Sequence, residues 1–224
     1  MRALLIDLDG TLSDSAPGIL SSLRRAFADV GVPPLDAETE FGLLGPPFYE
    51  SLPPLVGADQ VPAIIDRYRH YYDTAKYDTK VYDGMVDVLA DLRERGITLA
   101  VATSKPEAYA MPIVEHLGIA EYFAVIGGDA LDGSRETKAK VIASVLQRLG
   151  DPDPAELLML GDRSHDVDGA RAHAIGCLGA GWGYGRPGEL DGALEVFATP
   201  LDLLAQHERL FGEHAFGGSG AATA

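Results

Sequence analysis

The stretch ALLIDLDGTL (Ala3–Leu12) ends an apolar run with two aspartates close to the start of the chain. An apolar run without polar alternation predicts a strand buried on both faces of a parallel sheet. Asp7 and Asp9 are two residues apart, so their side chains point the same way if the strand continues. Because a buried carboxylate without a partner is costly, this pair indicates a functional site.

Four further apolar runs have the same character, and we expect them to be strands at 98–104, 122–128, 157–162 and 176–182. Helical periodicity lies between several of these runs, and each helical stretch ends at a glycine, the usual C-terminal stop of a helix. Strands that alternate with helices predict an α/β fold built on a doubly wound parallel sheet.

One stretch, residues 15–82, contains helical patterns but no convincing strand. It includes a proline-rich segment at 43–55 that we interpret as a loop. We therefore expect an inserted α-helical domain at 15–82, with the α/β core formed by 1–14 and 83–224. The small polar residues at about 212–224 predict a disordered tail.

The overall charge limits the classes of partner. The formal net charge of the 224 residues is −16, and a chain this acidic repels nucleic acid polymers and anionic membrane surfaces. A single cysteine, Cys177, excludes an internal disulfide and fits a reducing compartment. No apolar run is long enough to span a bilayer, so we expect a cytoplasmic protein, as a monomer or homodimer.

Polar side chains follow four of the expected strands. In an open α/β sheet, ligands bind at the carboxyl ends of the strands, so these side chains are expected to share one crevice. Among them, Lys105 and Arg163 are expected to lie close enough to touch a substrate. The set comprises Asp7, Asp9 and Thr11 after the first strand, Thr103, Ser104 and Lys105 after the second, Lys138 after the third, and Asp162, Arg163 and Asp166 after the fourth.

Four carboxylates in one crevice require cations. Two like charges ~4 Å apart repel by about 4 kcal/mol at an effective dielectric constant near 20. A hard divalent ion with oxygen ligands relieves this repulsion, and Mg²⁺ is the natural choice, with Lys138 supplying further positive charge. Such a site suits phosphoryl chemistry: one carboxylate attacks phosphorus, and a second moves protons to and from the reacting oxygens.

Each motif also has a purely structural interpretation. Asp7 and Asp9 suit a strand-end turn, Thr103 and Ser104 suit a helix cap, Lys138 suits a solvated surface, and Asp162 and Asp166 suit the first turn of a helix. The occurrence of all four motifs in order at strand ends favours the functional interpretation. The glycine-rich GAGWGYG (Gly179–Gly185) lacks a nucleotide-binding pattern, so we expect a turn beside the site.

In this order, IDLDGTL, AVATSKP, the lysine of SRETKAK and LMLGDRSHD resemble the four motifs of the haloacid dehalogenase-like hydrolase superfamily, in its phosphatase branch. The resemblance covers Met1–Asp14 and about 84–199, and implies a Rossmann-like core with a helical cap inserted at 15–82. It implies Asp7 as nucleophile and metal ligand, and Asp9 as general acid/base that also offers a backbone carbonyl to Mg²⁺. The remaining implied roles are phosphate binding by Thr103 and Lys138 and direct metal binding by Asp162. Asp166 is implied either to contact a group bound to the metal or to orient the lysine.

Within that branch, the chain looks most like phosphoglycolate phosphatases and bacterial 5'-nucleotidase-like proteins, through ATSKPE, LDGSRETKAKVI and GDRSHDVDGARAHAIGCLGAGWGYG. Ala139 replaces the proline common after this lysine in phosphoglycolate phosphatases, which leans slightly towards the nucleotidase-like group. The resemblance implies a Mg²⁺-dependent hydrolase of small phosphate esters, with a cap that closes over the substrate and sets specificity near 45–50. Two alternatives stay open: a phosphomutase and a non-catalytic phosphate-binding module.

Overall fold

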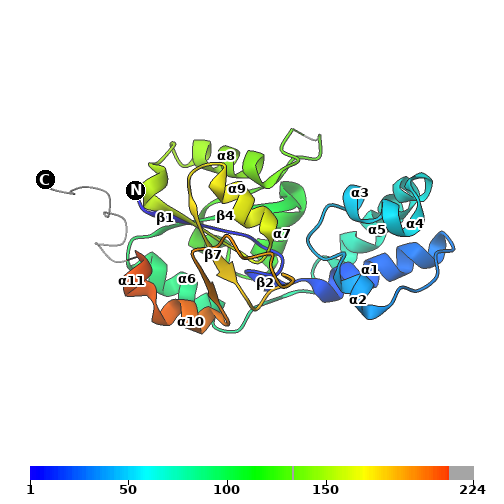
Figure 1. The fold of residues 1–224 in the computed structure, drawn as a ribbon, viewed down its shortest axis with the longest axis horizontal. Coiled ribbons are helices and arrows are strands. Elements are labelled where there is room, and N and C mark those ends of the chain that lie inside the picture. The colour runs from blue at the N-terminus through cyan, green and yellow to red at the C-terminus, as the bar shows by residue number, and fades with distance from the viewer. Residues whose placement is uncertain (133, 212–224) are drawn as a thin grey trace, which may run out of the picture. The chain divides into compact units, whose positions relative to one another are not determined.

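The computed structural model describes residues 1–132 and 134–211, so the tail expected at 212–224 lies outside the described residues (Figure 1). The chain divides into two compact units: Ser13–Lys80, and Met1–Leu12 together with the chain from Val81 onward. The expected insert, 15–82, begins and ends two residues later than the Ser13–Lys80 unit. Its action as a cap stays a prediction.

A six-stranded sheet forms the centre of the larger unit, in the order β5-β4-β1-β6-β7-β8, and every neighbouring pair is parallel. From β1 the chain adds β4 and β5 on one side and then β6, β7 and β8 on the other. This reversal of direction defines a doubly wound α/β fold, as predicted. The strands are β1 (Ala3–Ile6), β4 (Thr98–Pro106), β5 (Phe123–Asp129), β6 (Leu157–Gly161), β7 (Gly176–Ala180) and β8 (Glu195–Phe197).

Strand β1 lies between β4 and β6 and is buried on both faces. Its side chains alternate between two hydrophobic cores: Leu4 and Ile6 belong to one, Ala3 and Leu5 to the other. All four residues have no exposed surface. An unalternating apolar run is therefore required here, because each face of the strand packs against its own layer of helices.

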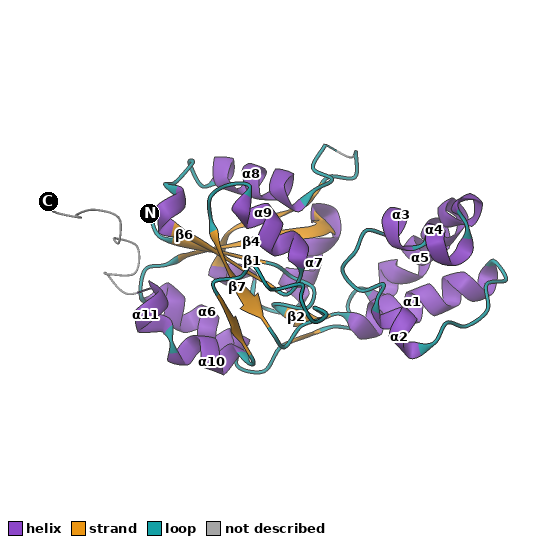
Figure 2. Cartoon of the chain, viewed as in Figure 1, coloured by secondary structure: helices purple, strands orange, loops and turns teal. Residues whose placement is uncertain are grey.

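Helices cover both faces of this sheet (Figure 2). The core that contains Leu4 also includes residues of α6, α7, α10 and α11, whereas the core that contains Leu5 includes residues of α8 and α9. The bounds are α6 (Met85–Glu94), α7 (Glu107–His116), α8 (Lys138–Arg148), α9 (Ser164–Arg171), α10 (Pro200–Ala205) and α11 (His207–Phe211), with short 3-10 turns η2 (Ala120–Tyr122) and η3 (Pro154–Glu156). None of the helices in the described part of the chain is long and apolar enough to cross a membrane.

The smaller unit is helical, as expected. Its longest helices pack tightly: a Cβ added to Gly18 of α1 would lie 2.2 Å from the carbonyl oxygen of Ala75 at the end of α5. Arg24 of α1 also pairs with buried Glu40 of α2 through both carboxylate oxygens. The helices are α1 (Ala16–Asp29), α2 (Ala37–Phe41), α3 (Phe48–Ser51), α4 (Pro53–Val56) and α5 (Val61–Ala75), with a 3-10 turn η1 (Ala58–Gln60).

The structure corrects three sequence interpretations. The segment 43–55, interpreted as a loop, contains the helices α3 and α4, because its prolines stand at helix starts, where a missing N–H costs nothing. A sixth strand, β8, was not predicted. Two short strands, β2 (Ser13–Asp14) and β3 (Lys80–Val81), form a separate two-stranded sheet where the chain enters and leaves the smaller unit.

We predict that Leu5→Ala lowers the free energy of unfolding by about 3 kcal/mol, because it leaves a cavity in a core with no exposed surface at that position. The control is Leu194→Ala, which removes a leucine that is 68% exposed and should change stability by less than about 0.5 kcal/mol. Chemical denaturation monitored by circular dichroism measures both. Equal losses for the two variants would contradict the assignment of β1 to the core.

Candidate functional site

Three buried carboxylates meet at the carboxyl ends of the two central strands. Asp7 follows β1 and its N–H donates to the carbonyl of Leu160 at 2.9 Å, so the β1–β6 pairing continues to this residue. Asp162 follows β6 directly, and Asp166 lies in the first turn of α9. One oxygen from each of Asp7, Asp162 and Asp166 lies within 4.8 Å of the others. Three of the four carboxylates predicted to share one crevice therefore lie together.

Lys138, the first residue of α8, joins this group. Its Nζ lies 2.9 Å from Oδ1 of Asp7 and 2.7 Å from Oδ1 of Asp166, and donates to the carbonyl of Ala102 at 3.0 Å. The lysine is only 6% exposed. A solvated surface lysine, the structural alternative for this residue, is therefore excluded.

The second aspartate of the opening stretch lies outside the group of three. Asp9 pairs instead with Lys105, whose Nζ is 2.7 Å from Asp9 Oδ2. Thr103 is buried in β4, and its hydroxyl oxygen accepts the N–H of Lys105 at 3.2 Å. Ser104, predicted to bind phosphate or substrate, is exposed. The β4 end thus supplies one buried hydroxyl and one cation near Asp9.

Asp162 is held by both of its oxygens. Thr11 donates its hydroxyl to Oδ1 at 3.2 Å, and the backbone N–H of Tyr184 donates to Oδ2 at 2.7 Å. The backbone approaches so closely that a Cβ on Gly10 would lie 2.3 Å from Asp162 Oδ2, and Gly10 has φ +83°. Gly183 is equally crowded, with its Cβ position 2.4 Å from Asp162 Cβ. The expected turn beside the site in Gly179–Gly185 is confirmed.

Arg163 follows Asp162 but directs its guanidinium elsewhere. It is 8% exposed and pairs through Nε and Nη2 with the two carboxylate oxygens of Glu189. Its backbone N–H donates to Oδ2 of Asp166 at 3.1 Å. In this structure Arg163 therefore ties the loop after β6 to the chain near Glu189, and contact with a substrate stays a prediction.

Burial, together with the neighbouring charges, explains the altered pKa values at the site. Burial raises the pKa of Asp7 to about 6; Asp166 adds to this rise and Lys138 opposes it. Burial also raises the pKa of Asp162 well above its usual value, with further contributions from Asp166 and Asp7. Burial disfavours the ammonium of Lys138, yet Asp166 and Asp7 outweigh this effect and hold the pKa of Lys138 above its usual value.

These residues fit a divalent cation. When all are ionised, the carboxylates of Asp7, Asp9, Asp162 and Asp166 and the ammonium groups of Lys105 and Lys138 leave a formal charge of −2. The buried Oδ1 atoms of Asp7 and Asp166 lie at ion-pair distance from Lys138 but accept no well-directed hydrogen bond. Carboxylate oxygens are the ligands that Mg²⁺ prefers, so this group has both the charge and the donors for it.

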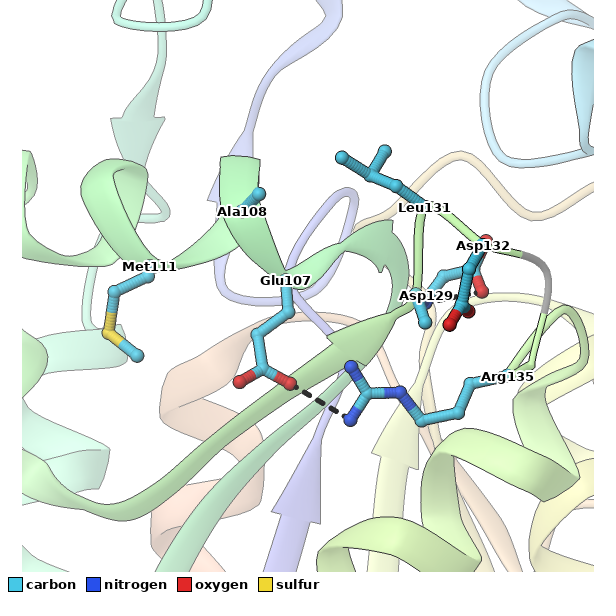
Figure 3. A pocket seen from close by; sticks show the side chains of 8 residues that line it. Glu107, Ala108, Met111, Asp129, Leu131, Asp132 and Arg135 are labelled. Carbon is cyan, nitrogen blue, oxygen red and sulfur yellow. Dashed lines mark hydrogen bonds and ion pairs between the residues drawn. The ribbon is translucent and has the colours of Figure 1, made fainter.

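A separate hollow of about 530 Å³ lies beside α7 and the loop after β5 (Figure 3). Its lining includes the carboxylates of Glu107, Asp129 and Asp132 and one guanidinium, that of Arg135. Arg135 pairs with Glu107 at 3.2 Å. Among the described residues that line the hollow, three are acidic and the one cation, Arg135, is paired with Glu107, so the hollow does not suit a phosphate. The carboxylate site at the strand ends is therefore the candidate for chemistry.

Sequence reasoning missed Tyr184 and Glu189. Tyr184 contributes only its backbone N–H to its contact with Asp162. Every residue except proline has this group, so the residue type gives no indication of it. Glu189 lies 26 residues beyond its partner Arg163, in a segment without recognisable periodicity. Only the glycines flanking Tyr184 could have indicated a close backbone approach there.

The haloacid dehalogenase-like hydrolase family matches residues 4–180 of the chain, a span that includes every candidate site residue named above except Tyr184 and Glu189. The chain belongs to the haloacid dehalogenase-like hydrolase family. This confirms the resemblance inferred from the four motifs.

One protein similar to this chain carries a kinase name. The tyrosine-protein kinase PtkA of Mycobacterium tuberculosis is 44% identical over 191 residues, which cover 85% of this chain and 65% of that protein. The chain thus spans just under two thirds of the length of this relative. A solved structure of PtkA has a TM-score of 0.80 at 41% identity, covering 94% of this chain and 98% of that one.

Two further proteins that are similar in sequence carry phosphatase names. A 5'-nucleotidase of Pseudomonas aeruginosa is 37% identical over 190 residues, which cover 84% of this chain and 86% of that protein. A phosphoglycolate phosphatase of Cupriavidus necator is 34% identical over 198 residues, which cover 83% of each chain. Their names belong to the two groups whose resemblance the sequence motifs indicated, the 5'-nucleotidase-like proteins and the phosphoglycolate phosphatases.

We predict that Asp7→Asn stabilises the metal-free protein at pH 8 by on the order of 2 kcal/mol. Because the pKa of Asp7 is raised from 3.8 to about 6, the folded protein binds a proton more tightly than the unfolded chain in this range. The free energy of unfolding therefore falls as the pH rises from 3.8 through about 6, and asparagine avoids that loss. Urea denaturation in EDTA at pH 5 and pH 8 measures the gain, which should shrink at pH 5.

The matched control is Asp168→Asn, whose side chain is 68% exposed on the same helix as Asp166 and should show no such gain. With excess Mg²⁺ at pH 8, the wild type should have a higher free energy of unfolding than Asp7→Asn, the reverse of the order in EDTA. A bound cation favours the ionised carboxylate. A destabilised Asp7→Asn in EDTA at pH 8 would show that the buried charge is not the dominant cost.

Proposed function

We propose that this protein is a Mg²⁺-dependent phosphomonoester hydrolase that acts through an aspartyl-phosphate on Asp7. The observation that carries the proposal is the group of Asp7, Asp162 and Asp166, with ligand oxygens within 4.8 Å of one another and Lys138 bridging two of them. The family membership supports hydrolysis, and the phosphatase names of two relatives support a phosphate ester as the substrate.

In the first step, a carboxylate oxygen of Asp7 attacks phosphorus and the bond from phosphorus to the ester oxygen breaks. Asp9, two residues further along the same segment, gives a proton to the departing oxygen. Lys138 and the hydroxyl of Thr103 bind the phosphoryl oxygens. Asp7, Asp162 and the backbone carbonyl of Asp9 would hold Mg²⁺, which would supply positive charge against the charge that develops on the phosphoryl group.

In the second step, Asp9 takes a proton from water as the water oxygen attacks phosphorus. The bond between phosphorus and Asp7 breaks, and inorganic phosphate leaves with the original carboxylate restored. Asp166 holds Lys138 in place throughout and so acts as a positioning residue. The hydrogen bonds from Thr11 and Tyr184 fix the orientation of Asp162.

The names of the relatives support a small phosphate ester as the substrate, such as a nucleoside 5'-monophosphate or phosphoglycolate. The unit Ser13–Lys80 is proposed to act as the cap that encloses it, with specificity set near 45–50. We include a cytoplasmic location, supported by the single buried cysteine, and a monomeric or homodimeric state in the same proposal.

A second candidate is transfer of the phosphoryl group to a hydroxyl other than that of water. The relative with 44% identity is named a tyrosine-protein kinase, which favours a tyrosine hydroxyl as acceptor over the sugar acceptor of a phosphomutase. The same aspartyl-phosphate would serve both reactions, because the acceptor is decided only when Asp9 activates an oxygen nucleophile.

We predict that the protein hydrolyses p-nitrophenyl phosphate with Mg²⁺, that EDTA abolishes the activity, and that Asp7→Asn lowers kcat by at least about 10³-fold. Asp7→Asn removes the nucleophile, whereas Asp168→Asn on the exposed face of α9 should leave kcat within twofold. Release of p-nitrophenolate measures all three. An Asp7→Asn variant with more than a tenth of the wild-type kcat would rule out the aspartyl-phosphate route.

The two candidates make opposite predictions with ATP. Incubation with ATP, Mg²⁺ and a tyrosine-containing peptide should yield no phosphotyrosine above the Asp7→Asn background if the enzyme is a hydrolase. Mass spectrometry of the peptide and of the protein itself measures the transfer. Phosphotyrosine that depends on Asp7 would favour the second candidate and set aside hydrolysis as the main activity.

A further inference from the structure

One side of α9 and of the turn that follows it contacts Lys138 from its ammonium to its backbone. Asp166, Gly169 and His173 are three and four residues apart, the spacing of neighbours on one helix face. Oδ1 of Asp166 lies 2.7 Å from Nζ of Lys138. A Cβ on Gly169 would lie 2.6 Å from Cγ of the lysine. Nε2 of His173 lies 2.8 Å from the carbonyl oxygen of Ala139, the next residue of α8.

The ion pairs of Lys138 attract its ammonium without fixing its direction. Nζ lies 2.9 Å from Oδ1 of Asp7 and 2.7 Å from Oδ1 of Asp166, yet neither oxygen accepts a well-directed hydrogen bond. Four flexible methylene groups separate this ammonium from the main chain, so it can be placed at many points around the carboxylates. The surroundings of the methylene stem therefore decide which of these points the ammonium takes.

Gly169 supplies the space for this stem. It lies inside α9 without a positive φ, and glycine is less favourable there than alanine, so the backbone gives no reason for it. A Cβ would lie 2.6 Å from Cγ and 3.0 Å from Cβ of Lys138, and 3.2 Å from Cδ1 of Ile142. The Ile142 methyl is the free end of its side chain, whereas Cγ of the lysine is held between the main chain and the paired ammonium. The absent side chain of Gly169 is thus the path of the lysine.

His173 holds the main chain from which the stem begins. A carbonyl oxygen can only accept, so Nε2 of His173 donates to Ala139. Ala139 is the second residue of α8 and directly follows Lys138. A cation is disfavoured at the N-terminus of a helix, so the first turn of α8 gains from an external tie. The hydrogen bond from His173 provides one and fixes this turn against the end of α9.

We propose that Gly169 and His173 are positioning residues, which together aim the ammonium of Lys138 at the phosphoryl group. This inference rests on the proposed hydrolase function, in which Lys138 binds the phosphoryl oxygens. Gly169 sets the path of the stem and His173 sets its starting point, and neither touches the reacting atoms. Displacement of a catalytic group by about 1 Å can lower a rate by about 100-fold, so both residues control the rate through Lys138.

Gly169→Ala tests the path of the stem. Helix propensity alone favours alanine, but the new Cβ displaces Cγ of Lys138, so we expect kcat for p-nitrophenyl phosphate to fall by about 10- to 100-fold. The matched control is Asp168→Ala, at the adjacent and exposed position of α9, which should keep kcat within twofold. Release of p-nitrophenolate in excess Mg²⁺ measures both. A fall of less than threefold in Gly169→Ala would overturn the proposal.

A second background separates positioning from damage to the fold. In Lys138→Ala the Cγ atom is absent, so adding Gly169→Ala should lower the urea midpoint of unfolding by less than it does in the wild type. An equal loss in both backgrounds would show that the methyl group acts independently of the lysine, and would overturn the proposal. The midpoint needs no activity, so this cycle holds even if the wild type hydrolyses no p-nitrophenyl phosphate. That last outcome would reject the hydrolase function instead.

His173 gives an independent test that holds even if Gly169→Ala fails to fold. His173→Ala removes the donor to Ala139 and should lower kcat by about fivefold, the factor that corresponds to one ordinary hydrogen bond. His173→Gln, whose amide can donate to the same carbonyl oxygen, should keep at least half of the wild-type kcat. An unchanged kcat in His173→Ala, or an equal loss in both variants, would overturn the proposal.

Discussion

The properties of the site at the carboxyl ends of β1 and β6 depend on the repulsion between carboxylates that the fold brings together. The pairing of β1 with β6 brings Asp7 beside Asp162, and the first turn of α9 adds Asp166. Water is largely excluded there, so the repulsion is not relieved by solvent. Lys138 offsets part of it, and the negative charge that remains favours a cation at this position.

The same repulsion makes the site a source of instability in the metal-free protein. The raised pKa values of Asp7 and Asp162 mean that the folded chain holds protons there which the unfolded chain releases. The ionised carboxylates of this group therefore lower the stability of the metal-free folded protein. The two hydrophobic cores on either face of β1 supply the stability that offsets this cost.

Much of this could be predicted from the sequence, because each central strand is a run of apolar residues that ends in a charged one. The unalternating apolar runs at 3–8 and 157–162 placed Asp7 and Asp162 at strand ends, and parallel pairing then brought them together. Strand β8 escaped prediction because it has three residues and exposes Val196 at 50%. The helices α3 and α4 were not predicted, because their prolines were interpreted as residues that end a helix. In the structure they stand where these helices begin.

Within the site, residue type predicted which groups meet but not how they pair. Lys105 and Arg163 were both expected to touch a substrate, yet one pairs with Asp9 and the other with Glu189. Which carboxylate each cation pairs with depends on backbone positions that differ by a few ångströms. The pattern of apolar and polar residues does not encode such small differences. The contact from Tyr184 is of the same kind, since any residue other than proline could donate that N–H.

The short sheet of β2 and β3 has a consequence for how this protein changes over evolutionary time. It places Ser13–Asp14 and Lys80–Val81 next to each other, so the points where the chain leaves and rejoins the α/β unit are neighbours. A segment with adjacent ends can be lengthened, shortened or exchanged without opening the parallel sheet. The helical unit can therefore be exchanged as one module, while the carboxylates that follow the parallel strands are inherited unchanged.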